Sequence, residues 1–239
     1  MARLESISRA QFRRAAPGRM RHAPCVMLPR HCHREAFVAV VLAGGYDEAG
    51  DTGRHRVQAG DVIFHRAFES HLDRFSGPGA EVLVLPLSEN WDGPQLGSIA
   101  DPDMIARTSE TDPWDALERL VAGFTERPIE AGDWPDALAR SLQSDLSLCL
   151  ADWADAFGLH PASLSRGFVQ TFGTTPAAYR LAQRTRRAID AVIFGNLPLS
   201  RIAFDHGFSD QAHMTRAVAQ LAGATPGALR RRQGMTLAA

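Results

Sequence analysis

The sequence has no lysine, only three cysteines and no apolar run long enough to cross a membrane. Cys25, Cys32 and Cys149 are odd in number and lack the spacing of a disulfide framework, which favours a reducing cytosol. Every apolar run is shorter than the roughly 18 residues of a transmembrane helix. Residues 1–24 contain arginines but no apolar core of signal-peptide length. We therefore expect a cytoplasmic protein that does not associate with membranes.

Charge is balanced over the whole chain but not along it. The net charge of −1 gives no indication of a nucleic-acid partner. Residues 160–239, however, hold ten arginines and three aspartates, a net charge of +7, whereas residues 1–139 have a net charge of −6. Such an asymmetry indicates an anionic partner for the C-terminal part, with a solvated basic face as the alternative.

One helical unit occurs twice within residues 150–230. Residues 173–176 (GTTP) recur 50 positions later as residues 223–226 (GATP), and residues 164–166 (LSR) recur as residues 214–216 (MTR). Several motifs that recur in order at one offset indicate a duplicated structural unit. Two copies are too few for a solenoid, so we interpret them as a repeated motif.

The first copy has the pattern of a helix-turn-helix. Its first helix has an apolar stripe formed by Leu150, Trp153, Ala154 and Phe157, and it is expected to end at Gly158. The second helix is expected to begin near Pro161. Its predicted buried face consists of Leu164, Phe168 and Phe172.

The second copy repeats this pattern after a longer connecting helix. Thr175 is the expected N-cap of the connecting helix, which is predicted over residues 176–194. Gly207 is expected to end the next helix, and Ser209 to cap the last helix of the motif. The predicted buried face of that last helix consists of Met214, Val218 and Leu221.

The outward face of each second helix carries short polar groups and one arginine, which are side chains that can bond base edges in a major groove. The candidate base-reading residues are Ala162, Ser165, Arg166, Gln211, Ala212, Thr215 and Arg216. The candidates for phosphate contacts are Ser163, Arg180 and Ser209. A 19-residue connecting helix is roughly 28 Å long, which suits holding two reading helices about one DNA turn apart.

These motifs resemble the DNA-binding domain of the AraC/XylS family of bacterial transcription regulators. The resemblance is closest at residues 207–216 (GFSDQAHMTR) and 223–226 (GATP), and it covers roughly residues 140–232. It implies helix-turn-helix motifs over about 148–172 and 199–222. Val218, Ala222 and Leu229 stand where the family usually has aromatic residues, so we expect looser packing in the second unit.

The N-terminal part has the pattern of a small all-β domain. Short segments rich in Val, Leu, Ile and Phe alternate with glycine-rich segments such as Gly44-Gly45 and Gly77-Pro78-Gly79. Regular spacing of this kind favours a sandwich or barrel. The predicted strands cover residues 25–28, 37–42, 54–58, 62–65, 71–75 and 81–87.

A second resemblance, to the two motifs of a cupin jelly-roll barrel, involves histidines. It is carried by His31, His33, Gly44, Gly60-Asp61 and His71. In metal-binding cupins two histidines and a glutamate come from the first motif and a third histidine from the second. Phe37 and its neighbours occupy the place of that glutamate.

Three interpretations of His31, His33 and His71 remain open: a site for zinc or another divalent ion, a polar effector pocket without metal, or structural histidines. We interpret His55 and His65 as structural, because neither has a comparable sequence context.

Residues 96–133 are predicted to be helical. Asp101-Pro102 and Asp112-Pro113 have the pattern of helix starts, with Asp as N-cap and Pro in the first turn. An apolar stripe, which either packs on its own domain or forms a dimer contact, follows the second start and consists of Trp114, Leu117, Leu120, Val121 and Phe124.

The sequence therefore predicts a two-domain α+β protein. Residues 1–95 are expected to form a cupin-like barrel that senses an effector, residues 96–133 a helical linker and possible dimerisation region, and residues 134–239 an all-α DNA-binding domain. The resemblances imply a homodimeric, non-enzymatic transcription regulator that binds promoter DNA and a small molecule, requires no cofactor, and contacts RNA polymerase if it is an activator. The alternatives are a metal-dependent cupin enzyme with an attached DNA-binding domain, and a metal-sensing regulator.

Overall fold

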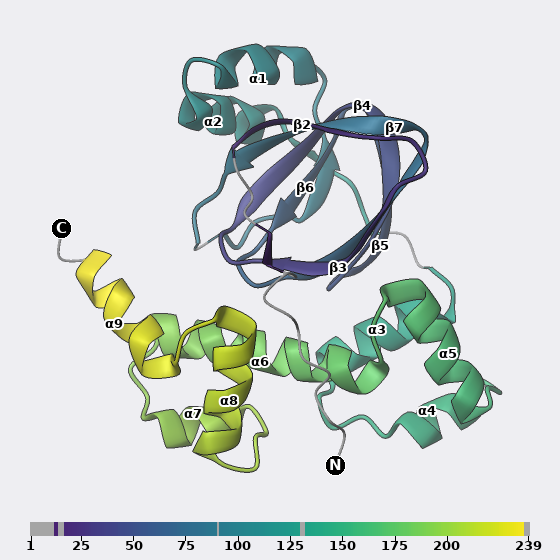
Figure 1. Ribbon diagram of the computed structural model, residues 1–239, viewed down its shortest axis with the longest axis vertical. Coiled ribbons are helices and arrows are strands. Elements are labelled where there is room, and N and C mark those ends of the chain that lie inside the picture. Colours follow the sequence, from purple (N-terminus) through teal and green to yellow (C-terminus); the bar gives the residue numbers. More distant parts are fainter. Residues whose placement is uncertain (1–11, 14–16, 90, 130–131, 237–239) are drawn as a thin grey trace. The chain divides into compact units, whose positions relative to one another are not determined.

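The computed structural model describes residues 12–13, 17–89, 91–129 and 132–236 (Figure 1). These residues form two compact units: the N-terminal unit extends to Ala137 and also contains Thr171–Gly173, and the C-terminal unit contains the remaining residues from Leu138 onward. The N-terminal unit is an antiparallel β domain with two helices, and the C-terminal unit is helical. The arginine-containing segment over residues 1–24 lies partly outside the described residues. No helix within the described ranges is both long and apolar enough to span a bilayer.

The described part of the β domain contains one mixed sheet in which every pair of strands is antiparallel except β1 with β3. Its strands run in the order β1-β3-β7-β4-β6-β8-β9, with β2 paired to β7 and β5 to β4. The bounds are β1 (Phe12–Arg13), β2 (Gly18–His22), β3 (Met27–His33), β4 (Phe37–Gly50), β5 (Gly53–Gln58), β6 (Asp61–His65), β7 (Ser70–Pro86), β8 (Leu96–Ser98) and β9 (Thr125–Glu126).

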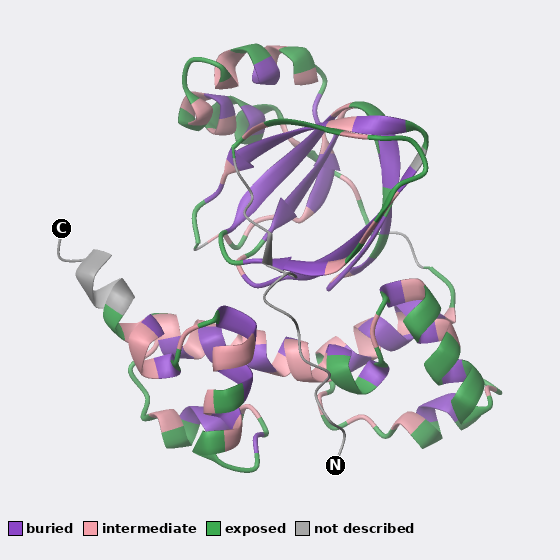
Figure 2. Cartoon of the chain, viewed as in Figure 1, coloured by how far each residue is buried: buried purple, intermediate pink, exposed green. Residues whose placement is uncertain are grey.

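Strand β6 and the first five residues of β4 are buried on both faces, which explains their continuous apolar runs, whereas β5 alternates between buried and exposed residues (Figure 2). Along β4, Val38 and Val40 belong to one core cluster, and Phe37, Ala39 and Val41 belong to another. Alternate residues of one strand therefore serve two separate cores. The core that contains Phe37 and Ala39 lies on the face with the cavity described below.

Strands β4 and β7 are longer than predicted, because two glycine segments expected to be turns lie within them. Gly44 and Gly79 have left-handed φ values of 69° and 74°. A Cβ atom on Gly44 would lie 2.0 Å from the carbonyl oxygen of Gly79. These glycines permit a close approach of two paired strands at a register irregularity, and strand pairing continues beyond it.

Helices α1 (Pro102–Ser109) and α2 (Pro113–Gly123) begin where predicted, with Asp101 and Asp112 as N-caps. Both helices pack on the core cluster that contains Val38 and Val40. The apolar stripe of α2 divides between two environments. Leu120 is fully buried and Leu117 and Phe124 pack against the same core, whereas Trp114 and Val121 are 54% and 42% exposed.

The helical unit contains the predicted duplication. The bounds are α3 (Trp134–Ser144), α4 (Leu150–Ala156), α5 (Pro161–Phe172), α6 (Pro176–Phe194), α7 (Leu199–Asp205), α8 (Gln211–Ala222) and α9 (Pro226–Thr236). The connecting helix α6 has the predicted bounds, and the Thr175 hydroxyl accepts a hydrogen bond from the backbone N–H of Ala178. Phe168 and Tyr179 are fully buried and their rings meet edge to face, with centroids 5.4 Å apart, between α5 and α6.

Candidate functional site

The turns of the two helix-turn-helix motifs have the same backbone conformation. Gly158 follows α4 with φ of 64°, and Gly207 follows α7 with φ of 70°. Residues with a side chain rarely adopt these left-handed values, so glycine at both positions permits the turn into the next helix. The predicted helix ends at Gly158 and Gly207 are confirmed. Phe157 is a partial exception to the predicted stripe, since it stacks on Trp153 but stays 50% exposed.

The N-cap of α8 is Asp210, and the prediction of Ser209 was wrong. Asp210 Oδ1 accepts a hydrogen bond from the backbone N–H of His213 at 2.6 Å, and this bond lowers the pKa of the Asp210 carboxyl group. The carboxylate suits the cap because it is a charged acceptor at the positive end of the helix. Ser209 is exposed, and its hydroxyl contacts Asp210 and His213.

The outward faces of α5 and α8 are available to solvent. On α5 the exposed candidate residues are Ala162, Ser163, Ser165 and Arg166. On α8 the exposed candidates are Gln211, Ala212 and Arg216, whereas Thr215 is half-buried. The opposite faces are buried, as predicted, by Leu164, Phe168 and Phe172 on α5 and by Met214, Val218 and Leu221 on α8. This burial fixes which side chains each helix presents outward.

Three of the four arginines of α6 bind backbone carbonyl groups of their own domain. Arg180 Nη1 donates to the carbonyl oxygen of Leu148 at 2.7 Å, and Arg184 Nη1 donates to that of Gly207 at 2.7 Å. Arg187 donates to the carbonyl oxygen of Gln143. These bonds tie α6 to the segments around both motifs. Arg180, a candidate for phosphate contact, is half-buried in this arrangement.

The β domain contains a cavity of about 270 Å³ that is open to solvent on one side. Part of its lining is apolar, including Leu28, Phe75, Val82 and Val84. The polar part of the lining consists of His22, His31, His33, Glu48, His65, His71 and Asp73. The cavity therefore offers both apolar contacts and several metal-ligating or hydrogen-bonding groups to a small ligand.

His31, His33 and His71 converge in this cavity. His31 on β3 is the direct cross-strand partner of His71 on β7, and their ring centroids lie 4.4 Å apart. One ligand atom from each of the three residues lies within 4.8 Å of the others, as expected for three imidazoles able to share an ion. The metal-site interpretation requires this convergence, and metal binding by the three histidines stays a prediction.

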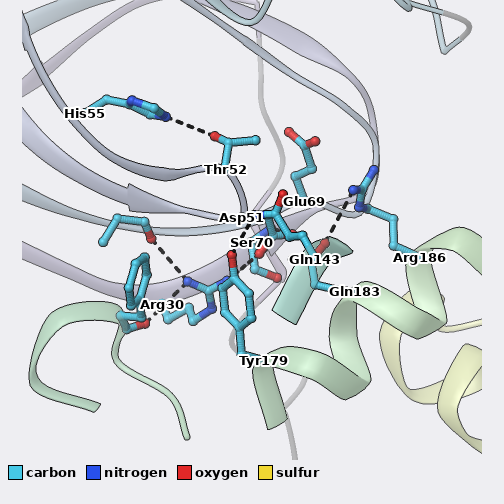
Figure 3. Close-up of polar contacts among 12 residues, drawn as sticks. Arg30, Asp51, Thr52, His55, Glu69, Ser70, Gln143, Tyr179, Gln183 and Arg186 are labelled. Atoms are coloured by element: carbon cyan, nitrogen blue, oxygen red, sulfur yellow. Dashed lines mark hydrogen bonds and ion pairs between the residues drawn. The ribbon is translucent and has the colours of Figure 1, made fainter. Parts of the chain in front are cut away.

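An ion pair next to two of these histidines holds the strand ends together (Figure 3). Arg30, which precedes His31, donates to Asp51 Oδ1, and the backbone N–H of Ser70, which precedes His71, donates to Asp51 Oδ2 at 3.1 Å. The Asp51 side chain is nearly inaccessible to solvent. This buried carboxylate therefore fixes β3 and β7 where they carry His31 and His71.

Sequence reasoning missed Glu48 and His65. These two residues and His71 form a second group of three ligand atoms within 4.8 Å of one another. His65 Nε2 lies 3.6 Å from Glu48 Oε2. Glu48 fell outside the predicted strand because that strand was expected to end near Leu42. The sequence does contain a signal for His65. Side chains alternate between the two faces of β6, so His65 lies on the same face as Ile63, which belongs to the core that contains Phe37.

Burial controls protonation in the cavity. It lowers the pKa values of His65 and His71 well below the usual range, so both rings are neutral near pH 7. Burial, with a further contribution from Asp73, raises the pKa of Glu48. His55 differs in position, because its ring is hydrogen-bonded to Thr52 at 2.9 Å (Figure 3) and does not line the cavity. Burial lowers the pKa of His55 to about 4.

Residues 153–232 match a protein-family profile described as a helix-turn-helix domain. No curated protein matches the sequence. Among solved structures, the C-terminal domain of AraT, a response regulator from Geobacillus stearothermophilus, is 22% identical, with 44% of this chain and 88% of that chain covered and a TM-score of 0.39. An AraC-type transcriptional regulator from Chromobacterium violaceum is 24% identical, with 40% of this chain and 88% of that chain covered and a TM-score of 0.38.

ToxT from Vibrio cholerae is similar over a longer stretch, with 12% identity, coverage of 92% of this chain and 97% of that chain, and a TM-score of 0.42. The matched range begins within α4 and includes α5, the connecting helix α6 and both helices of the second motif. The residues of closest resemblance, 207–216, lie within the matched range. The C-terminal part of this chain is a helix-turn-helix domain of the AraC/XylS type.

Proposed function

We propose that the protein is a sequence-specific, DNA-binding transcription regulator that reads promoter DNA with α5 and α8. The observation that supports this most strongly is the duplication, in which two equivalent helices bury matching faces and expose short polar side chains with one arginine each. A helix of this kind fits the major groove, where a side chain can distinguish all four base pairs.

Base reading is assigned to the outward-facing candidate residues of the two helices. Arg166 and Arg216 would each donate two hydrogen bonds to a guanine, which discriminates against another base by about 1–3 kcal/mol. Further contacts with base edges are assigned to Ala162, Ser165, Gln211, Ala212 and Thr215. Apolar contact by the two alanines suits a thymine methyl group.

Phosphate contacts are assigned to groups near helix N-termini. Ser163 lies in the first turn of α5, and Ser209 lies just before α8. Backbone N–H groups in such positions are donors without helical partners, and the helix dipole favours an anion there. Arg180 is a third candidate, and it would have to exchange its bond to Leu148 for a phosphate oxygen.

The β domain is assigned a sensory role. Its cavity of about 270 Å³, with apolar and polar walls, is suited to a small-molecule effector. We also propose a homodimer, with the exposed Trp114 and Val121 of α2 in the contact. In this proposal residues 1–95 bind the effector, residues 96–133 connect the two domains and form the dimer contact, and residues 134–239 bind DNA. Effector binding changes DNA affinity only if it binds two states of the protein unequally.

The test is a titration of DNA with single variants. The probe is a duplex enriched by the wild-type protein from a random-sequence pool, compared with a scrambled duplex of the same composition at two salt concentrations. Arg166→Ala and Arg216→Ala should each weaken binding to the enriched duplex by about 1–3 kcal/mol and relax the preference at one base position. Arg231→Ala is the matched control, since Arg231 is an exposed arginine outside both motifs.

The two kinds of arginine contact give different results. Loss of an arginine that contacts only phosphate would weaken binding to both duplexes equally and reduce the salt slope by about one. Wild-type affinity of both variants for the enriched duplex would show that α5 and α8 do not form the reading surface.

A further inference from the structure

We infer that Glu48, His65 and His71 form a binding site for a divalent transition-metal ion inside the β domain. The three side chains come from β4, β6 and β7, and all three are buried. Neither Glu48 nor His65 belongs to the cupin-like motifs, which contain only His71 of the three. The inference does not depend on DNA binding by the helical domain.

The geometry is close to that of a metal site. Zinc binds nitrogen and oxygen ligands at about 2.0–2.2 Å, which places the ligand atoms of a tetrahedral site about 3.4 Å from one another. His65 Nε2 and Glu48 Oε2 are already 3.6 Å apart. The ligand atoms of all three residues lie within 4.8 Å of one another, so a side-chain rotation of His71 would complete the contacts.

The position of Glu48 gives the first independent reason for a metal ion. The buried carboxylate of Asp51 pairs with the guanidinium group of Arg30. Glu48 Oε2 lies instead 3.6 Å from Nε2 of His65, an imidazole nitrogen that can itself bind a metal ion. A divalent ion placed between these two atoms would bind both of them.

The imidazole of His71 gives the second reason. His71 Nδ1 is buried and makes no hydrogen bond to any described residue. Its Nε2 lies 3.7 Å from Asp73 Oδ2, and a carboxylate in that position orients a metal-binding ring.

The three-histidine set predicted from sequence competes for the same ion, because His71 belongs to both groups. A carboxylate ligand offsets part of the ion's double charge directly, which an imidazole ligand does not. Two imidazoles with one carboxylate also form a known ligand set for zinc. We therefore assign the ion to the group that contains Glu48.

Zinc binding by single variants of the full-length protein tests the inference. The protein is first freed of metal by dialysis against a chelator, and zinc affinity is then measured in competition with a chromophoric chelator. Wild type should bind about one zinc ion per chain. Glu48→Gln and His65→Gln should each weaken zinc binding at least about 100-fold, whereas His31→Gln and His33→Gln should weaken it less than about tenfold.

The control variant is His55→Gln, because His55 is a buried histidine on the neighbouring strand β5 and belongs to neither ligand group. It should keep wild-type zinc affinity. Glu48→Gln should also raise the melting temperature of the metal-free protein, since it removes a buried acid beside Asp73. Lower zinc affinity in a more heat-stable protein cannot be caused by unfolding.

Two results would overturn the inference. One is a wild-type protein that binds no zinc. The other is retention of zinc by Glu48→Gln and His65→Gln together with its loss in His31→Gln and His33→Gln. That second pattern would assign the ion to the three-histidine set.

Discussion

Replacing Gly44 with alanine should disrupt the β domain at the point where its two longest strands approach most closely. Alanine at φ of 69° is strained by about 1–2 kcal/mol. Its Cβ atom would lie 2.0 Å from the carbonyl oxygen of Gly79, at least 1 Å closer than Cβ atoms normally approach. Relief of that overlap requires β4 and β7 to separate locally, which disturbs the backbone pairing of Gly44 with Ala80. We expect a total loss of about 3–5 kcal/mol in the free energy of unfolding.

Gly77→Ala is the matched control for this substitution. Gly77 lies on β7, and a Cβ atom there would meet no atom within 4 Å. Since alanine also restricts the unfolded chain, the control should be neutral or stabilise by up to about 1 kcal/mol. Urea denaturation followed by tryptophan fluorescence measures both, because Trp91 stacks on Phe64 in the β-domain core. Equal urea midpoints for Gly44→Ala and wild type would refute the close approach of β4 and β7.

Three other predictions concern thiol reactivity, the two repeats and the dimer. Burial raises the pKa of Cys32 to about 12, so only about one ten-thousandth of this thiol is ionised at pH 8. A thiol reagent at that pH should modify the exposed Cys25 and Cys149 in the native protein and modify Cys32 only after denaturation. Rapid reaction of a third thiol in the native protein would contradict this. Phe168→Ala should lower the free energy of unfolding, measured by urea denaturation, by about 3–5 kcal/mol, and the equivalent Val218→Ala should lower it by about 2 kcal/mol. Both side chains are fully buried, but phenylalanine is the larger. Equal losses in the two variants would argue against equivalent packing of the two repeats. Trp114→Asp combined with Val121→Asp should yield folded monomers in sedimentation, and a persistent dimer would place the interface elsewhere.

The helical repeat could be predicted closely because its signals are local. Thr175 and Pro176 define the start of α6 within two adjacent residues, and Gly158 and Gly207 mark turns through their own backbone conformation. Burial followed from helical periodicity, which depends only on spacing along the chain. The one misplaced cap involved Ser209 and Asp210, two adjacent residues that both favour the N-cap position, of which the charged one is used.

The β domain was less predictable because its decisive contacts are distant in sequence. From its sequence context, Gly44 is expected to lie in a turn. Its actual role, a close approach to Gly79, depends on a residue 35 positions away. The early end assigned to the strand then left Glu48 outside the sheet. Likewise, the ring centroids of His65 on β6 and His71 on β7 lie 4.7 Å apart although these two strands do not pair with each other. The motif histidines were found because His31 and His33 are two residues apart on one strand and therefore share a face.

The α2 stripe shows how one pattern can serve two purposes. The sequence left open whether it packs on its own domain or forms a dimer contact. Leu120 is fully buried in the β-domain core, while Trp114 remains more than half exposed. Periodicity identifies an apolar face but does not specify how wide the contact beneath it is. The exposed edge of that face is the part now assigned to the proposed dimer.

Selection of duplexes from a random-sequence pool by the full-length protein tests most directly whether α5 and α8 read DNA sequence. If they do, the enriched duplexes should share two short sequence blocks whose centres lie about one helical turn, roughly 10 base pairs, apart. The Arg166→Ala variant should lose the preference within one block and Arg216→Ala the preference within the other. A pool that stays random after selection by the folded wild-type protein would contradict sequence-specific recognition.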